Sequence, residues 1–483
     1  MKKFLFAILL TYCPLKCYPC EKTSPINELE FQLVYVNIFD SEIYDSYFQQ
    51  MHSFVQQELQ GSPNLADAIH SPKHDATAFE RKGLKFLEEL LSYNLQDPYS
   101  KALFHSDKIK QLRNLIKHKK KWEVDGTPIQ RKIAEFIDNL TVWLYTRPDL
   151  SNSIKKFMYQ EVGLDENLVF YTFKKEPQSF FNNIHTILAN LARFSDREKQ
   201  ERILNDPNLY GDMPSVLFEL SNKKTTMIRT PSIVRDLKID EVNGKTIAAA
   251  LNEEFLNYLK ASRGKLHFYV NLLDREKKDL IKSSLIENLE SDPEVGPSIA
   301  VITLDKQKAA DFYFQKGEFQ DLSNANQFKS AFFSKLFDPD GLYYWSNKLE
   351  PIEWKNQVLE ILEEIHQQFF SGREELMIEE RLDFIEITYL KIIEAIVEKI
   401  HPDVMNITCK QSVDRGPSVY MLYYLYDRLK TGRPVEFEIQ NMYWLLFSAP
   451  LAFHNRPGHD YRISRFQTAA NRMIQSLSNP LAY

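Results

Sequence analysis

The sequence is poor in glycine, contains no long apolar run and carries no excess of positive charge. Only 14 of its 483 residues are glycine, which disfavours collagen-like chains and glycine-rich β-architectures. The best apolar candidate, residues 4–10, is far shorter than the roughly 18 residues of a membrane-spanning helix. The net charge of −6 excludes bulk electrostatic binding to nucleic acid, so we expect no nucleic-acid partner.

Cysteine is also scarce, with 4 residues in the whole chain. Cys13, Cys17 and Cys20 lie close to the amino terminus, whereas Cys409 has no other cysteine near it in the sequence. A zinc site of the paired-cysteine type therefore cannot be assembled around Cys409. We expect neither a metal ion nor another cofactor.

The sequence does contain ample material for a buried core. Apolar residues make up 43% of the chain and aromatic residues 13%, which excludes a mainly disordered protein. Because a domain usually takes about 100–200 residues, the length favours two or three domains.

The amino terminus has the pattern of a bacterial secretory signal peptide. Residues 1–3 carry two lysines and residues 4–10 are apolar, so we expect a signal peptide over residues 1–20. The alternative is an ordinary buried strand or helix. Cleavage near Cys20 would leave Cys409 as the only thiol of a secreted or periplasmic protein. Because exported proteins usually pair their cysteines or omit them, a retained thiol indicates a chemical role, or delivery into a reducing compartment such as a host cell.

The hydrophobic pattern changes along the chain. Residues 26–40 alternate between apolar and polar side chains and predict a strand, and residues 46–220 show helical periodicity. The polar segment 221–245 is the best candidate for a linker. We therefore expect a mainly helical domain over residues 21–222 and an α/β domain over residues 223–483.

The expectation of an α/β domain comes from strands that alternate with helices. The apolar and β-branched runs predict strands at 266–272, 298–304, 310–314 and 405–408. The three- and four-residue periodicity predicts helices at 246–260, 354–370, 374–400 and 417–430, with Pro417 at the first helical position and Gly432 as a stop.

The most informative segment is residues 405–418, which predicts a strand, a loop and a helix. Cys409 and Arg415 stand at the two ends of the loop in a Cys-x5-Arg spacing. Backbone N–H groups and the helix dipole make such a loop an anion cradle, and they lower a cysteine pKa from about 8.5 toward about 3.5–7.5. The thiolate can attack phosphorus, while the arginine fork clamps two phosphate oxygens. The alternative is a small buried cysteine beside a surface arginine.

The segment Cys409-Lys410-x-x-x-Asp414-Arg415 resembles the loop of the cysteine-dependent phosphatases, the protein tyrosine phosphatase superfamily. It is most similar to bacterial phosphoinositide phosphatase effectors, and its Asp-Arg pair is similar to that of myotubularin and Sac-type lipid phosphatases. The resemblance closely covers about fifteen residues. It implies a phosphatase-like α/β domain, following a helical domain, with a strand–P-loop–helix active site. Cys409 would be the nucleophile, Arg415 the phosphate clamp and Lys410 an extra cation.

The loop also departs from the family pattern. Gly416 stands where a Ser or Thr normally follows the arginine and hydrogen-bonds the thiolate, and Ser418 is the alternative donor. Ser412 replaces a usual glycine, and Val413 stands where many inositide-specific loops have a second lysine. The predicted substrate-binding residues are Lys410, Gln411, Ser412, Val413, Gly416 and Ser418.

A general acid should protonate the leaving oxygen. Residues 337–341 resemble the mobile Trp-Pro-Asp loop of the superfamily, which implies that Asp340 is the acid. The alternative for this segment is an ordinary Pro-Asp-Gly turn. Asp414, inside the loop, is the rival acid.

Two further segments are rich in polar or basic residues. Residues 454–467 either extend the phosphate site, with Gln467 placing the hydrolytic water, or form a solvated loop. The pair His459-Asp460 is similar to ligands of metal-dependent phosphohydrolases, but His401 and His454 do not fit the remaining ligand pattern. The basic run 108–122 either touches anionic lipid head groups, as a peripheral membrane contact, or forms a solvated helix face.

Three hypotheses follow from these patterns. The first is an exported hydrolase, a metal-free cysteine phosphatase acting on phosphoinositides, inositol phosphates or phosphotyrosine through a phosphocysteine intermediate. The second is a catalytically weak phosphatase-like module that binds a phosphorylated partner. The third is an exported structural or interaction protein with an accidental Cys-x5-Arg spacing.

Overall fold

The computed structural model describes residues 42–70, 77–92, 98–150, 152–153, 214–222, 224–239, 246–275, 279–306, 311–339, 341–410, 412, 415–432 and 460–478. The predicted signal peptide, residues 1–20, and the predicted strand, residues 26–40, lie outside these residues.

The amino-terminal described part is helical, as its periodicity predicted. Its helices are α1 (Glu42–Gln60), α2 (Pro63–His70), α3 (Ala78–Leu91), α4 (Pro98–Asp125) and α5 (Pro128–Thr146). Capping boxes begin α3, with Thr77 and Glu80, and α5, with Thr127 and Gln130. The Thr127 hydroxyl donates to Glu80 Oε1 at 2.6 Å, so the two caps also fix the two helices to each other.

A mostly parallel five-stranded sheet makes the chain a mixed α/β protein. The strands are β1 (Ser215–Glu219), β2 (Thr226–Arg229), β5 (His267–Asn271), β6 (Ile299–Thr303) and β7 (Val404–Thr408). Their order is β1-β2-β7-β5-β6; β1 is antiparallel to β2, and the other neighbours are parallel. The predicted strands at 266–272, 298–304 and 405–408 are thereby confirmed as β5, β6 and β7.

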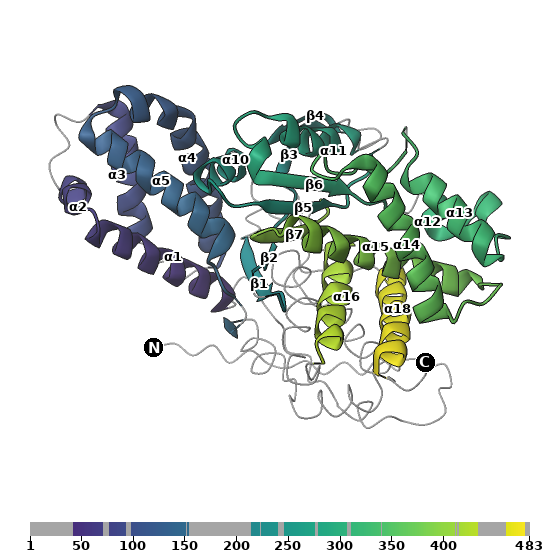
Figure 1. Ribbon diagram of the computed structural model, residues 1–483. Helices are drawn as coiled ribbons and strands as arrows, with labels where there is room; N and C mark the ends of the chain where they lie inside the picture. The colour runs from purple at the N-terminus through teal and green to yellow at the C-terminus, as the bar shows by residue number, and fades with distance from the viewer. Residues whose placement is uncertain are drawn as a thin grey trace, which may run out of the picture. The chain divides into compact units, whose positions relative to one another are not determined.

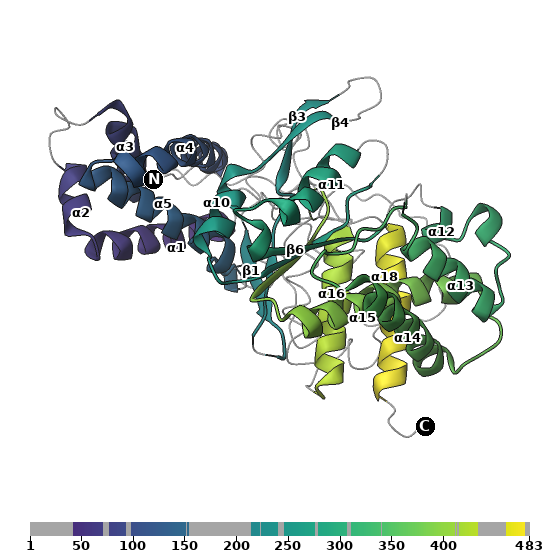
Figure 2. The same cartoon turned by 45° about the horizontal axis from the view of Figure 1, so that its top comes forward.

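The remaining elements surround this sheet. Strands β3 (Val234–Ile239) and β4 (Thr246–Leu251) pair as a separate antiparallel ribbon (Figure 2). The helices are α10 (Glu253–Ala261), α11 (Leu280–Glu287), α12 (Asp311–Phe314), α13 (Ala325–Leu336), α14 (Pro351–Phe370), α15 (Ile378–Ile400), α16 (Arg415–Lys430) and α18 (Asp460–Ser478), with 3-10 turns η4 (Asn288–Ser291), η5 (Gly296–Ser298) and η6 (Gly317–Phe319).

Helices cover the sheet on two sides. On one side, Tyr258 of α10 contacts His267 of β5 through its hydroxyl at 3.1 Å, and the ring of Phe255 lies 6.1 Å from that of Tyr269. On the other side, α16 packs against β7 and lies beside α18, which in turn contacts α15 (Figure 1). The helices predicted at 354–370 and 374–400 are confirmed as α14 and α15. None of the described helices is long and apolar enough to cross a membrane.

The predicted linker 221–245 was wrong over most of its described length, because it contains β2 and β3. Its polar residues form a hairpin turn: Asn222 Oδ1 accepts from the backbone N–H groups of Lys224 and Thr225 at 2.9 and 3.1 Å. The turn joins β1 to β2, so the expected domain boundary at 222 falls inside a pair of hydrogen-bonded strands.

Two shorter elements were also predicted with the wrong type. Residues 246–251 form strand β4 instead of the start of a helix, because pairing with β3 overrides the helical preference of the alanines. Residues 311–314 form the short helix α12 instead of a strand. Helix α16 begins at Arg415, so Pro417 occupies its third position and not its first.

Candidate functional site

The candidate site lies where the central strand of the sheet ends. Strand β7 stops at Thr408, α16 starts at Arg415, and the predicted loop joins them. In open parallel sheets, ligands bind outside the carboxyl ends of the strands, where loops and helix amino termini gather. The strand and the helix of the predicted strand–loop–helix unit therefore stand where a ligand site is expected.

Strands β2 and β7 separate just before this loop. Their last ladder pair is Ile228 with Asn406. Beyond it, Tyr420 of α16 fills the gap: its hydroxyl accepts from the Ile407 N–H at 2.7 Å and donates to the Ile228 carbonyl at 2.6 Å. The separation leaves room for a side chain from α16 between two strands of the sheet.

The start of the loop is fixed to the segment that follows β2. Thr408 Oγ1 donates to the Thr230 carbonyl at 2.7 Å, and the Ser232 N–H donates to the Lys410 carbonyl at 3.2 Å. These bonds hold the backbone on both sides of Cys409, so the position of its thiol is set by the sheet.

Cys409 is a free cysteine and is 4% exposed. Its sulfur lies close enough to the hydroxyls of Tyr269 and Tyr420 for a charge on the sulfur to act on them. Burial raises the pKa of both tyrosines above the usual value, and a negative charge on Cys409 would add to that rise. Burial is common to an inert core cysteine and to a nucleophile at the base of a cradle, so it decides between these hypotheses only together with Arg415.

Arg415 places its half-buried guanidinium at the edge of the sheet. Its Nη1 donates to the carbonyl of Leu272, just after β5, at 2.5 Å. The Leu272 N–H in turn donates to the Thr408 carbonyl at 2.8 Å. Arg415 and the residue before Cys409 therefore both bind Leu272, at the junction between β5 and β7.

Ser412 and Gly416 pack against each other within the loop and the first turn of α16. A Cβ atom at Gly416 would lie 2.7 Å from Ser412 Oγ and 3.0 Å from the Ile407 carbonyl oxygen. A Ser or Thr after the arginine would therefore require the Ser412 hydroxyl to move. The Ser412 hydroxyl is 0% exposed, takes the available space and has no hydrogen-bond partner among the described residues.

Ser418 and Lys410 lie in different surroundings. Ser418 Oγ donates to the Arg415 carbonyl at 2.9 Å, which uses its hydroxyl within the first turn of α16. The Lys410 side chain is half-exposed, and its Nζ lies 3.5 Å from Asp236 Oδ2. Lys410 therefore stands at the mouth of the site.

The sequence reasoning missed Asp236, which comes from β3. Its carboxylate pairs with buried Lys282 at 2.9 Å and accepts from the Thr246 hydroxyl at 2.7 Å. Burial alone would raise the pKa of Asp236, but Lys282, Thr246 and Lys410 lower it below the usual value. An ionised carboxylate is not a proton donor, so Asp236 orients Lys410 and does not serve as an acid.

The two candidate acids, Asp340 and Asp414, lie outside the described residues, as do Gln411 and Val413. Residues on either side of Asp340 are described. The Gly341 N–H donates to the Asp338 carbonyl at 3.0 Å, which makes a tight turn. Arg275, which follows β5, donates from Nη1 to the Gly341 carbonyl at 2.8 Å. The turn is thus bound at the carboxyl end of β5, where Arg415 also binds.

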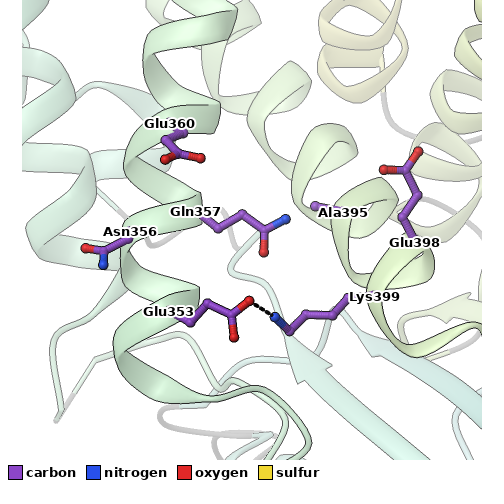
Figure 3. Close-up of a pocket in the computed structure, with 7 residues that line it drawn as sticks. All are labelled: Glu353, Asn356, Gln357, Glu360, Ala395, Glu398 and Lys399. Carbon is purple, nitrogen blue, oxygen red and sulfur yellow. Dashed lines mark hydrogen bonds and ion pairs between the residues drawn. The ribbon is translucent and has the colours of Figure 1, made fainter.

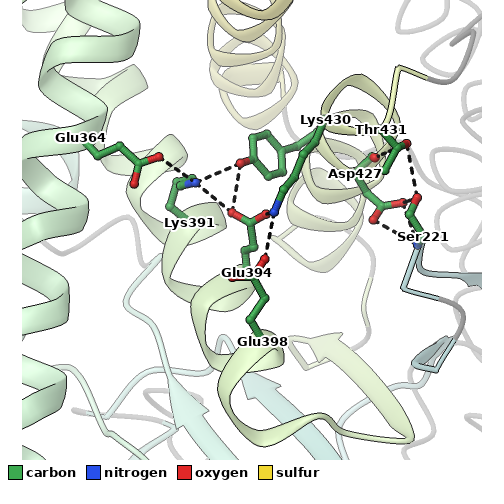
Figure 4. A network of polar contacts seen from close by, with 9 residues as sticks. Ser221, Glu364, Lys391, Glu394, Glu398, Asp427, Lys430 and Thr431 are labelled. Atoms are coloured by element: carbon green, nitrogen blue, oxygen red, sulfur yellow. Dashed lines mark hydrogen bonds and ion pairs between the residues drawn. The ribbon is translucent and has the colours of Figure 1, made fainter.

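The far end of α16 is fixed by a polar network (Figure 4). Glu394 of α15 lies 2.6 Å from Lys430 and 2.9 Å from Lys391, and it accepts from the Tyr426 hydroxyl at 3.0 Å. On the other side of α16, Asp427 accepts from the Ser221 hydroxyl at 2.6 Å. The helix that carries Arg415 is therefore held by α15 and by the β1–β2 turn.

The segment predicted as either a phosphate-site extension or a solvated loop is described from Asp460 onward. There it forms α18, and Arg462, Arg465 and Gln467 are all buried. The solvated loop is therefore wrong for these three residues. His459 lies outside the described residues.

The basic run 108–122 lies on α4 and largely makes ion pairs. Arg113 donates to both carboxylate oxygens of Glu254 at 2.8 Å, and Lys119 lies 2.5 Å from Asp138. These pairs connect α4 to α10 and α5, a structural role that neither sequence-based alternative included.

One surface cavity of about 370 Å³ lies between α14 and α15, away from Cys409 (Figure 3). Three of its seven lining residues are glutamates, and Lys399 there pairs with Glu353. A phosphate would meet carboxylates in this cavity. Among the described residues, no group of three or more His, Cys, Asp or Glu side chains could hold a metal ion.

The sequence matches no family model, and comparison with curated proteins and with solved structures finds no similar protein.

Proposed function

We propose that the protein is a cysteine-dependent phosphatase that hydrolyses phosphate monoesters without a metal ion. The observation that carries the proposal is that Arg415, at the amino terminus of α16, and Thr408, which directly precedes Cys409, both bind the backbone of Leu272 at the β5–β7 junction. The helix dipole there favours both a thiolate and a phosphate dianion.

In the proposed reaction, Cys409 attacks phosphorus in line. The S–P bond forms as the P–O bond of the ester breaks, and a carboxylic acid, Asp340 or Asp414, gives its proton to the leaving oxygen. Water then attacks the phosphocysteine and gives a proton to the same carboxylate, which restores the acid; the S–P bond breaks, and the thiolate and inorganic phosphate are released. Arg415 neutralises charge on the equatorial oxygens in both steps.

Lys410 is suited to a highly charged substrate, because it places a second cation at the mouth of the site. Phosphoinositides, inositol phosphates and phosphotyrosine are the proposed substrates. The proposed setting is export by the signal peptide at residues 1–20, with action outside the cytoplasm or in a host cell.

The second candidate is a phosphatase-like module with weak turnover. The observation that favours it is Gly416, which provides no hydroxyl to assist the thiolate. In that case the loop would bind a phosphorylated partner and release it unchanged.

Phosphate release from a panel of phospholipids, inositol phosphates and phosphopeptides tests the proposal. We expect release by the wild-type chain and none by Cys409→Ser, which still binds substrate. Arg415→Lys tests the phosphate clamp, because it keeps the charge but removes the planar fork. Arg428→Lys is its matched control, because Arg428 lies on the same helix with its guanidinium over the Tyr424 ring, 5.0 Å from the centroid. Binding without release by the wild-type chain would favour the second candidate. If neither the wild-type chain nor Cys409→Ser binds any phosphate compound, only an accidental Cys-x5-Arg spacing remains.

A further inference from the structure

A second group of cations lies at the carboxyl end of β6, two strands away from β7. Lys306 follows this strand and is 2% exposed, and its Nζ pairs with Glu386 of α15. Helix α18 adds Arg462 and Arg465, which are 6% and 8% exposed. Three buried cations therefore meet in one place on the carboxyl edge of the sheet.

Glu386 is the carboxylate that pairs with this group, and its oxygens are occupied. Besides Lys306, it accepts from the Tyr313 hydroxyl at 2.5 Å and lies 3.3 Å from Arg465 Nε. Arg465 also donates to the Tyr313 carbonyl at 2.8 Å, and its guanidinium carbon lies 3.8 Å from the centre of the Tyr313 ring. Lys306 and Arg465 are therefore compensated by contacts within the protein.

Arg462 is less well compensated: its guanidinium carbon lies 5.0 Å from the centre of the Tyr461 ring, and no ion pair joins it to a carboxylate of the described residues. Its Nη2 donates to the Lys306 carbonyl at 2.8 Å, whereas Nε and Nη1 have no hydrogen-bond partner among the described residues. A buried guanidinium with unpaired N–H groups is unfavourable. An anionic ligand would accept hydrogen bonds from these N–H groups and neutralise the charge.

Charge on the neighbouring groups supports an anion at this position. Burial lowers the pKa of Lys306 to about 8, and repulsion by Arg465 and Arg462 contributes to that lowering. Lys306 stays protonated at neutral pH, so the group keeps its positive charge. Planar guanidinium groups favour oxyanions, phosphate above all, because two N–H groups match two oxygens.

We propose that Arg462, supported by Lys306 and Arg465, binds a second phosphate group of the substrate. Neighbouring strands lie about 4.8 Å apart, so the carboxyl ends of β6 and β7 are about 10 Å apart. The substrate is then a small molecule with at least two phosphate monoesters. This inference rests on the proposed phosphatase activity of Cys409, and it favours a polyphosphorylated polyol or its lipid-linked form over a singly phosphorylated peptide.

The test is a binding measurement on Cys409→Ser protein, in which no ligand is consumed. Inositol 1,4,5-trisphosphate and inositol 1-phosphate are the soluble probes, and phosphatidylcholine vesicles containing phosphatidylinositol 4,5-bisphosphate are the lipid probe. We expect Arg462→Gln to weaken trisphosphate binding about 10–100-fold and to leave monophosphate binding within about twofold. Loss of vesicle binding in the same variant would identify the lipid-linked source, and unchanged vesicle binding the soluble one.

Arg472→Gln is the matched control, because Arg472 lies on the same helix and pairs with Asp383 at 3.0 Å. We expect this control to bind the trisphosphate like its parent. Without ligand, Arg462→Gln should unfold at the same temperature as its parent or higher, since it removes a buried charge that no carboxylate compensates. Equal trisphosphate binding by Arg462→Gln and its parent, or unfolding of Arg462→Gln without ligand, would overturn the inference.

The same data separate this inference from the proposed function. Phosphate release by the wild-type chain together with unaltered binding by Arg462→Gln would leave the phosphatase proposal standing and remove the second site. If Arg462→Gln selectively loses trisphosphate binding but the wild-type chain releases no phosphate, the second phosphate site stands and the phosphatase proposal fails.

Discussion

At the residue scale, the loop is shaped by two small residues that share one space. Ser412 adopts a left-handed backbone conformation with φ of +51°, which a serine rarely adopts, and its hydroxyl lies where a side chain at position 416 would be. In the phosphatase loops that this segment resembles, a glycine stands at the first position and a residue with a hydroxyl at the second. This chain has Ser412 at the first position and Gly416 at the second. The two departures therefore belong together, because the Ser412 hydroxyl fills the space that the missing side chain of Gly416 leaves.

This pairing predicts a coupled pair of substitutions. Gly416→Ala should lower the free energy of unfolding by about 1–3 kcal/mol, because the new methyl group meets Ser412 Oγ and the Ile407 carbonyl. Ser412→Gly should be neutral or stabilising by up to about 1 kcal/mol. Urea unfolding of both variants and of the double variant measures the coupling. Additive effects would show that the two side chains do not share this space.

A second prediction concerns His267, which is buried in β5. Burial lowers its pKa to about 4, and the neutral ring donates from Nε2 to Asn406 Oδ1 at 2.8 Å. The unfolded state binds a proton near pH 6.5 and the folded state only near pH 4. Stability from this residue is therefore complete above pH 6.5 and is lost as the pH falls toward 4, by about 3 kcal/mol in total.

Urea unfolding at several pH values checks this prediction. His267→Gln should reduce the loss of stability between pH 6.5 and 4 relative to the wild-type chain. An equal loss in both proteins would show that other groups cause the acid sensitivity.

At the element scale, the strength of the pattern decided which elements could be predicted. Strands β5, β6 and β7 are buried at every position, so their sequences are continuous apolar or β-branched runs between polar turns. Strand β2 has four residues, and β3 exposes half of its residues. Strands of this kind form because they hydrogen-bond to neighbouring strands, and no local hydrophobic pattern in the sequence predicts them.

The network on α16 gives a prediction at this scale. Glu394→Ala should lower the free energy of unfolding by about 2–4 kcal/mol, because it leaves largely buried Lys391 with one carboxylate fewer. Lys430→Ala, which removes a half-exposed partner of the same carboxylate, should cost less than about 1 kcal/mol. Chemical denaturation of the two variants compares them. Equal effects would contradict a supporting role for Glu394 in holding α16.

At the scale of the whole molecule, the candidate site is assembled from segments far apart in the chain. The spacing of Cys409 and Arg415 and the helix after them could be predicted from the sequence. Asp236 could not, because nothing local connects β3 to the loop; the sheet brings them together. Arg462 and Arg465 belong to the polar and cationic segment 454–467, which the sequence analysis identified. Their burial beside Lys306 could not be predicted, because it depends on how α18 packs against α15.

The central claim is that Cys409 is a thiolate held opposite Arg415. The rate of alkylation by iodoacetamide as a function of pH, read at the Cys409 peptide by mass spectrometry, measures this most directly. We predict a midpoint between about pH 3.5 and 7.5, moved upward in Arg415→Ala and unchanged in Arg428→Lys. A midpoint near pH 8.5 in the wild-type chain, with no effect of Arg415→Ala, would contradict the account.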